Sequence, residues 1–109
     1  MNSISLPEPV ASFWEAVNAH DEQGFLDAFT VEGAVDDWGR TFAGRKEIKA
    51  WSDKEFIGAR GTLEIHSASE DNGQIVVVGD WKSNYANGLS KFTFETSGGK
   101  LAKMTIREG

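Results

Sequence analysis

The sequence predicts an α+β fold in which three helices in the first half pack on a curved, mostly antiparallel sheet built from the second half. Two observations favour this class. Apolar residues recur with helical spacing up to Gly58, whereas from Gly61 onward runs rich in β-branched and aromatic residues alternate with Asn-Gly and Gly-Gly pairs. A chain of 109 residues fits one domain, so we predict a single domain over residues 1–109.

Three segments carry the periodicity of helices. The first places four apolar side chains on one face, namely Val10, Phe13, Trp14 and Val17. Asp21 is suited to cap a short second helix, whose buried side holds Phe25, Leu26 and Phe29. The third helix starts near Gly44, ends by Gly58 and repeats Ile48, Trp51, Glu55 and Phe56 along one side.

Five strands are predicted. A brief strand spans residues 34–38, and a turn-rich link through Gly39 and Gly44 follows it. Four longer strands cover residues 62–70, 74–86, 90–96 and 100–107, joined by turns at Asn72-Gly73, Asn87-Gly88 and Gly98-Gly99. Both faces of the segment 75–78 are apolar, so we expect the sheet to be covered on both sides there.

Composition argues against several classes of partner. A net charge of −6 repels the phosphate backbone of nucleic acids and anionic lipid, so we expect neither nucleic acid nor a membrane as a partner. No segment approaches the ~18 apolar residues of a transmembrane helix, and residues 1–6 lack the pattern of a secretory signal. Together with the absence of cysteine, this predicts a cytoplasmic protein without disulfides.

The sequence also lacks the motifs of common cofactors. The two histidines are far apart and have no i, i+4 partner, so no metal site is predicted. A phosphate-binding Walker loop, a dinucleotide-binding glycine pattern and a Gly-x-Ser-x-Gly nucleophile motif are all missing. We therefore expect no cofactor.

Four local patterns, in this order and spacing, resemble one known superfamily. They are Phe13-Trp14 followed by residues 18–21, Phe29 followed by residues 32–37, Gly44 opening a helix with Ile48 and Trp51, and Gly99-Lys100-Leu101 leading to Met104. In these features the chain is similar to the nuclear-transport-factor-2-like superfamily, which includes ketosteroid isomerase, scytalone dehydratase and SnoaL-like polyketide cyclases. The resemblance implies a cone-shaped sheet wrapped around a helix, a pocket at the wide end, and a homodimer across the outer sheet face.

The resemblance implies a candidate catalytic base, Asp37, at the position where isomerase-like members carry a carboxylate. The alternative is that Asp36 and Asp37 both serve the turn before Gly39, a place that favours aspartate. His66, on a predicted strand, is the second candidate catalytic residue, paired with Asp37 across the pocket, and its alternative is a structural role.

The isomerase pattern also fails at two positions. Its oxyanion hole needs a tyrosine and a protonated aspartate, which is the worked example of a carboxylic acid kept neutral to donate a hydrogen bond. Phe13 stands where the tyrosine belongs, and the second acid falls at Ser90 or Lys91. A steroid isomerase of the known type is therefore not expected.

Four tryptophans in 109 residues suggest aromatic pocket walls suited to a small hydrophobic molecule. For Trp14 and Trp51 the helical spacing equally predicts a place in the core, whereas Trp38 stands in a turn beside Asp37. The predicted pocket-lining set is Phe13, Trp14, Trp38, Trp51, Trp81, Tyr85 and Phe92.

A basic cluster near the third helix could steer an anionic substrate to the pocket, or could be an ordinary solvated helix face. Its members are Arg40, Arg45, Lys46 and Lys49.

Two functions remain open from the sequence. The first is a cofactor-independent isomerase, cyclase or dehydratase with Asp37 as base and His66 or Tyr85 as its partner. The second is a non-catalytic module that binds a hydrophobic ligand or dimerises. An open cavity of about 300 Å³ or more beside Asp37 is the observation that bears most directly on both.

Overall fold

The three predicted helices are present in the computed structural model, which describes residues 5–109. They are α1 (Val10–Asn18), α2 (Glu22–Asp27) and α3 (Arg45–Glu55). The Asp21 side chain caps α2 as predicted, because its Oδ1 accepts a hydrogen bond of 3.1 Å from the backbone N–H of Gly24. Residues 1–4, part of the segment that lacks a signal pattern, lie outside the described residues.

Six strands form one sheet in the order β2-β1-β6-β5-β4-β3. They are β1 (Phe29–Asp37), β2 (Arg40–Ala43), β3 (Thr62–Asp71), β4 (Gln74–Lys82), β5 (Gly88–Ser97) and β6 (Lys100–Glu108). All neighbouring strands run antiparallel except β1 and β6, which are parallel. The predicted α+β class with a mostly antiparallel sheet is confirmed.

The first hairpin of the sheet differs from the sequence prediction. Strand β1 is longer than predicted, since Phe29 begins this strand instead of ending the second helix, and β2 was not predicted at all. Trp38 and Gly39 form the turn between β1 and β2 with φ values of +55° and +91°. Two positive φ angles in succession give the twist that two-residue hairpin turns need, so the predicted link is a β-hairpin.

The connection between β4 and β5 also differs. Residues 83–87 form a loop, where a two-residue turn at Asn87-Gly88 was expected. The loop is closed by side chains: Asn87 Oδ1 accepts from the Ser83 N–H at 2.9 Å, and Ser83 Oγ donates to the Ala86 carbonyl at 2.7 Å. Asn87 thus stabilises the loop through its side chain and does not occupy a left-handed turn position.

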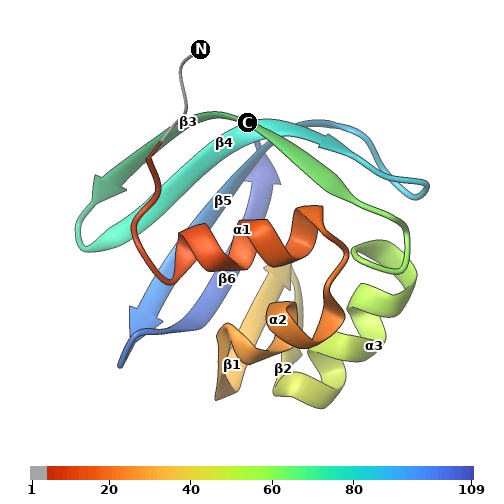
Figure 1. The fold of residues 1–109 in the computed structure, drawn as a ribbon, viewed down its shortest axis with the longest axis horizontal. Helices are drawn as coiled ribbons and strands as arrows, with labels where there is room; N and C mark the ends of the chain where they lie inside the picture. The colour runs from red at the N-terminus through yellow and green to blue at the C-terminus, as the bar shows by residue number, and fades with distance from the viewer. Residues whose placement is uncertain (1–4) are drawn as a thin grey trace.

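The curved sheet wraps around α1, which lies across its concave side, while α2 and α3 sit beside β1 and β2 (Figure 1). Register shifts interrupt three strand pairs, β1 with β6, β3 with β4 and β5 with β6. Such bulges bend strands and increase their twist, which helps this sheet to curl.

An aromatic cluster fills the space between α1 and the sheet. The fully buried Phe13 ring lies 4.9 Å from Trp14, 5.6 Å from Phe25 and 5.4 Å from Phe94, measured between ring centroids. Edge-to-face and tilted pairs of this kind add to the free energy gained by burying the rings. This cluster closes the interior below the wide end of the sheet.

On β4, one face is buried through Ile75, Val77 and Trp81, whereas Val76 and Val78 on the other face are only half-buried. The expected cover on both sides is therefore incomplete within the chain. Among the described helices, none has the length and apolar character needed to cross a membrane.

The β1–β2 turn is fastened to β6 by Asp36. Its carboxylate accepts two hydrogen bonds from the Arg107 guanidinium, at 3.0 and 3.1 Å, and a third of 2.8 Å from the Gly39 N–H. The Arg107 hydrogen bonds, followed by the one from Gly39, lower the pKa of Asp36 below its ordinary value. The ionised carboxylate is the form that these contacts stabilise.

We therefore expect Asp36→Asn to lower the melting temperature at pH 7 by a few degrees. Because the folded-state pKa is depressed, the stabilisation is present above the unfolded pKa of about 3.9 and is lost as pH falls through the folded value. The difference between wild type and variant should thus shrink below about pH 4. Thermal unfolding monitored by circular dichroism from pH 3 to 7 measures it, with Glu15→Gln on the exposed face of α1 as control. A difference that persists unchanged at pH 3 would contradict this role.

Candidate functional site

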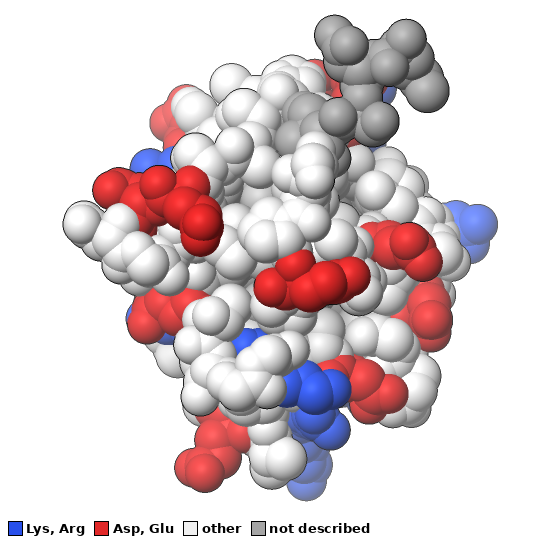
Figure 2. Space-filling view, turned by 60° about the vertical axis from the view of Figure 1, so that its left-hand side comes forward, with Lys and Arg blue, Asp and Glu red and all other residues white. Residues whose placement is uncertain are grey.

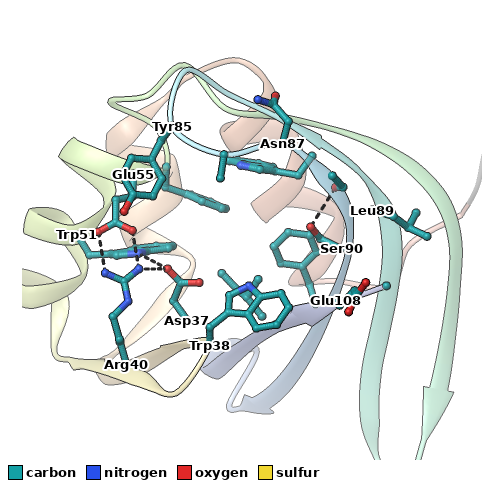
Figure 3. Close-up of a pocket in the computed structure, with 17 residues that line it drawn as sticks. Asp37, Trp38, Arg40, Trp51, Glu55, Tyr85, Asn87, Leu89, Ser90 and Glu108 are labelled. Carbon is teal, nitrogen blue, oxygen red and sulfur yellow. Dashed lines mark hydrogen bonds and ion pairs between the residues drawn. The ribbon is translucent and has the colours of Figure 1, made fainter.

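The wide end of the cone contains an open hollow of about 730 Å³, within the usual range for ligand pockets (Figure 3). Three regions form it: the β1–β2 hairpin, the end of α3, and the facing ends of β4, β5 and β6 with the 83–87 loop. The lining residues are Asp37, Trp38, Arg40, Trp51, Glu55, Phe56, Trp81, Tyr85, Ala86, Asn87, Gly88, Leu89, Ser90, Phe92, Ile106, Glu108 and Gly109. An open cavity therefore does lie beside Asp37.

Stacked aromatic rings form one wall. Trp51 stacks on Phe42 at 5.9 Å and on Phe56 at 4.8 Å, and Phe56 in turn stacks on Trp81 at 4.4 Å with only 12° between the ring planes. The stack joins β2, α3 and β4. We call these four residues the aromatic ladder. Its members Trp51, Phe56 and Trp81 line the hollow and give it an apolar side.

Gly61 makes room for the Trp81 ring at the end of this ladder. A Cβ atom at Gly61 would lie 2.1 Å from the Trp81 indole, well inside van der Waals contact. Only glycine therefore allows the backbone before β3 to pass the indole this closely.

The neighbouring aspartates at the end of β1 have separate roles. Asp36 holds the turn, as described above, whereas the Asp37 side chain faces the hollow (Figure 3). Asp37 Oδ2 accepts hydrogen bonds from Arg40 at 2.5 Å and from the Trp51 indole N–H at 3.1 Å. Its Oδ1 accepts none from the described residues. Asp37 thus presents one oxygen to the hollow while the other fixes its position.

Arg40 links Asp37 to a second carboxylate, Glu55. The guanidinium donates to both oxygens of Glu55, at 3.0 and 2.5 Å, and the pKa of Arg40 is raised, chiefly by this interaction. The Asp37 and Glu55 side chains are each only 13% exposed, so the cation compensates two largely buried acids. Sequence reasoning did not assign Glu55 to the site, although a carboxylate on the apolar side of the third helix was a signal.

The basic cluster does not line the hollow as a group, because Arg40 is its only member there. Lys49 is paired with Glu22 and Asp53 on the surface, and Arg45 donates to the Phe29 carbonyl. These contacts do not support the idea that the basic cluster steers an anionic substrate to the hollow. On the face shown in Figure 2, acidic side chains are spread widely, in keeping with the net charge of −6.

Five of the seven residues predicted to line the pocket do so: Trp38, Trp51, Trp81, Tyr85 and Phe92. Phe13 and Trp14 do not, which corrects the prediction. Both are at most 1% exposed and belong to the aromatic cluster under α1. The Trp14 Nε1 is buried without a hydrogen-bond partner among the described residues. These two rings lie on the helix that fills the cone, below its open end.

His66 does not face Asp37, so the predicted pairing of the two across the pocket is wrong. His66 occupies the bulge in β3, and its Nε2 lies 3.3 Å from Asp80 Oδ2 and 3.9 Å from Glu64 Oε1. Asp80 alternates with the inward-facing Trp81, so this group lies on the outer face of the sheet. The three ligand-type atoms are within 4.8 Å of one another but open to solvent. Among residues 5–109, no histidine or cysteine lines the hollow itself.

Comparison with known proteins identifies the fold. No family model and no curated protein matches the chain. Among solved structures, a candidate polyketide cyclase from Sinorhizobium meliloti is 20% identical, with a TM-score of 0.82 over 94% of this chain and 95% of that one. A Catenulispora acidiphila protein with a ketosteroid isomerase-like fold, solved with trimethylamine, is 16% identical, with a TM-score of 0.77 over 96% and 88% of the two chains.

A third structure is a Mycobacterium tuberculosis protein in complex with estradiol-17β-hemisuccinate, which is 19% identical, with a TM-score of 0.79 over 92% of this chain and 90% of that one. Identities this low establish the fold alone. The chain therefore has the nuclear-transport-factor-2-like fold, and the resemblance inferred from sequence is confirmed at that level.

Trp38 combines two unusual features at the mouth of the hollow. Its backbone is in the left-handed region, with φ of +55°, and its side chain leaves the residue 59% exposed. Asparagine and glycine fit such a turn position better than tryptophan. A strained position that exposes a large ring over a cavity indicates a functional constraint.

Trp38→Asn should therefore unfold at the same or a higher denaturant concentration, with a gain of up to roughly 1 kcal/mol. Trp38→Val is the matched control, since it also removes the ring but disfavours positive φ, and it should be less stable than Trp38→Asn. Urea unfolding measures both. If Trp38→Asn is no more stable than Trp38→Val, positive φ does not strain this position. If Trp38→Asn is less stable than the wild type, the ring contributes packing energy that outweighs any strain in the turn.

Proposed function

We propose that this protein binds a small apolar molecule in the hollow, with a polar group of that molecule placed at the free oxygen of Asp37. The observation that carries the proposal is the pairing of an open cavity of about 730 Å³ with the aromatic ladder and one oriented carboxylate. Largely apolar walls with a few placed polar groups are the usual composition of small-molecule sites. The ladder would supply apolar contact to the ligand, and Asp37 would orient it.

Proteins of the same fold give this proposal support. The Mycobacterium tuberculosis neighbour holds an estradiol derivative, and the Catenulispora acidiphila neighbour was solved with trimethylamine. A rigid steroid skeleton and a small amine differ greatly in size. These neighbours therefore support small-molecule binding by this fold, but they do not identify the ligand of this chain.

Catalysis is the second candidate function, and the geometry of Asp37 favours it. Two donors on Oδ2 hold the carboxylate so that Oδ1 could take a proton from a carbon atom of the ligand. Tyr85, also in the lining, is available as a hydrogen-bond donor to the developing oxyanion. The missing second acid at Ser90 or Lys91 argues against the ketosteroid isomerase arrangement, so the reaction would be a different proton transfer.

Binding is tested with estradiol and Nile red, two neutral apolar molecules, followed by tryptophan quenching and calorimetry. We expect saturable binding with a negative heat-capacity change. Removing the exposed ring in Trp38→Asn should weaken binding about fivefold or more, because this ring contacts the ligand at the mouth. The control is Val31→Asn, which removes a 74% exposed apolar side chain of β1 outside the hollow and should leave affinity unchanged. Equal losses in the two variants would contradict the proposed site.

The catalytic alternative is separated from simple binding by Asp37→Asn. If Asp37 is a base, the variant should lose at least about 10²-fold of any turnover found with the wild type while still binding ligand. Product analysis on activated carbonyl compounds, run beside the quenching titration, measures both. Binding without any product in the wild type would leave the protein as a ligand-binding module.

We further propose that the protein is a homodimer across the outer face of the sheet. There Val76 and Val78 of β4 are only half-buried, on a face that the chain covers incompletely, and they lie opposite Thr93 and Lys91 of β5. Val76→Lys should then shift sedimentation equilibrium at micromolar concentration from dimer to monomer. A wild type that sediments only as monomer would contradict this.

A further inference from the structure

Resting on the proposed binding function, we propose that the hollow is selective for organic cations: the ligand carries a quaternary or tertiary ammonium group on an apolar body, and anions of the same shape are rejected. The proposal depends on three features of the lining, namely its balance of charge, the engagement of its only basic side chain, and the position of its aromatic rings.

The charges that line the hollow are three carboxylates and one guanidinium, a balance of −2. Arg40 is the guanidinium, and both of its terminal nitrogens already donate to Asp37 and Glu55. Three hydrogen bonds from this guanidinium go to the two carboxylates, whose combined charge exceeds its own. An anion entering the hollow would therefore meet a cation that is already paired, together with uncompensated negative charge.

A cation finds the opposite situation. Glu108 lines the hollow and makes no ion pair with any described residue, and Asp37 Oδ1 has no donor among them. Figure 3 shows Trp38 between Asp37 and Glu108, with the Asp37 carboxylate turned toward the open space. Two carboxylate groups with free oxygen atoms thus face the volume that a ligand would occupy. The net charge of −6 on the whole chain adds a field that attracts cations.

Aromatic faces supply the second half of the recognition. Trp38 and Tyr85 are 59% and 60% exposed and lie on opposite sides of the Asp37 carboxylate (Figure 3). Their π faces carry partial negative charge and attract alkylammonium groups, which are too large and too weakly hydrated to need a shell of oxygen ligands. A metal ion is a poorer fit to the same space, because the rings offer no ligand atoms and both oxygens of Glu55 are engaged.

The test compares three probes that share a phenyl ring and differ in charge. They are 2-phenylethyl trimethylammonium, its uncharged tert-butyl isostere (3,3-dimethylbutyl)benzene, and the anion 4-phenylbutanoate. We expect the ammonium to bind roughly tenfold more tightly than the isostere, and the anion at least about tenfold more weakly than the isostere. Raising the salt concentration from 0.02 to about 0.5 M should weaken binding of the ammonium but not of the uncharged isostere, because salt screens only the charged ligand.

Glu108→Gln and Asp37→Asn should each reduce the preference of the hollow for the ammonium over the isostere about threefold or more. Glu15→Gln, which removes the same charge from the exposed face of α1, should leave it unchanged. Circular dichroism of each variant verifies folding.

An isostere that binds as tightly as the ammonium overturns the selectivity while leaving the binding function intact. Equal effects of all three variants overturn it as well, because the preference would then come from net charge. Failure of all three probes, together with estradiol and Nile red, rejects the binding function itself.

Discussion

The Arg40 guanidinium joins the carboxylates of Asp37 and Glu55, and the rest of the site depends on this contact. It connects the β1–β2 hairpin with the end of α3, the two elements that frame one side of the hollow. The Asp37 and Glu55 side chains are each only 13% exposed, and the guanidinium that pairs with both supplies the positive charge that compensates them. With the cation in place, one oxygen of Asp37 is fixed and the other is left for a ligand.

The same contact determines which ligands suit the hollow. Because Arg40 already pairs with two carboxylates, the lining keeps an excess of negative charge that disfavours an incoming anion. The aromatic ladder adds an apolar wall, and Trp38 adds an exposed ring at the mouth. Shape, apolar surface and negative potential therefore coincide in one cavity, which is the physical basis for both proposals.

Sequence patterns predicted the helices and the strands after Gly61 because each has a regular period or a strong turn signal. Strand β2 was missed because it is four residues long and follows a turn, Trp38-Gly39, that lacks the usual asparagine or aspartate. The different roles of Asp36 and Asp37 could not be predicted from two neighbouring aspartates in the sequence. They follow from strand alternation, which turns Asp36 to Arg107 on the outer face and Asp37 into the hollow.

Helical spacing likewise could not separate core tryptophans from pocket tryptophans. Trp14 and Trp51 both stand on the apolar side of a helix, yet Trp14 packs in the centre of the cone and Trp51 lines its open end. The difference lies in where each helix sits against the sheet, which is a property of the tertiary fold. His66 was misplaced for the same reason, since a bulge determines the side of the sheet that it faces.

The four tryptophans permit a direct test of the central claim, which is that a ligand binds in the hollow beside Asp37. Each gives one indole N–H signal in a two-dimensional ¹H–¹⁵N NMR spectrum, which single Trp→Phe variants can assign. On titration with estradiol, the signals of Trp38, Trp51 and Trp81 should move, while that of the buried Trp14 should stay in place, since only the first three line the hollow. Movement of Trp14 alone, or of none of the four at concentrations where estradiol binds, would show that the ligand does not occupy the space beside Asp37.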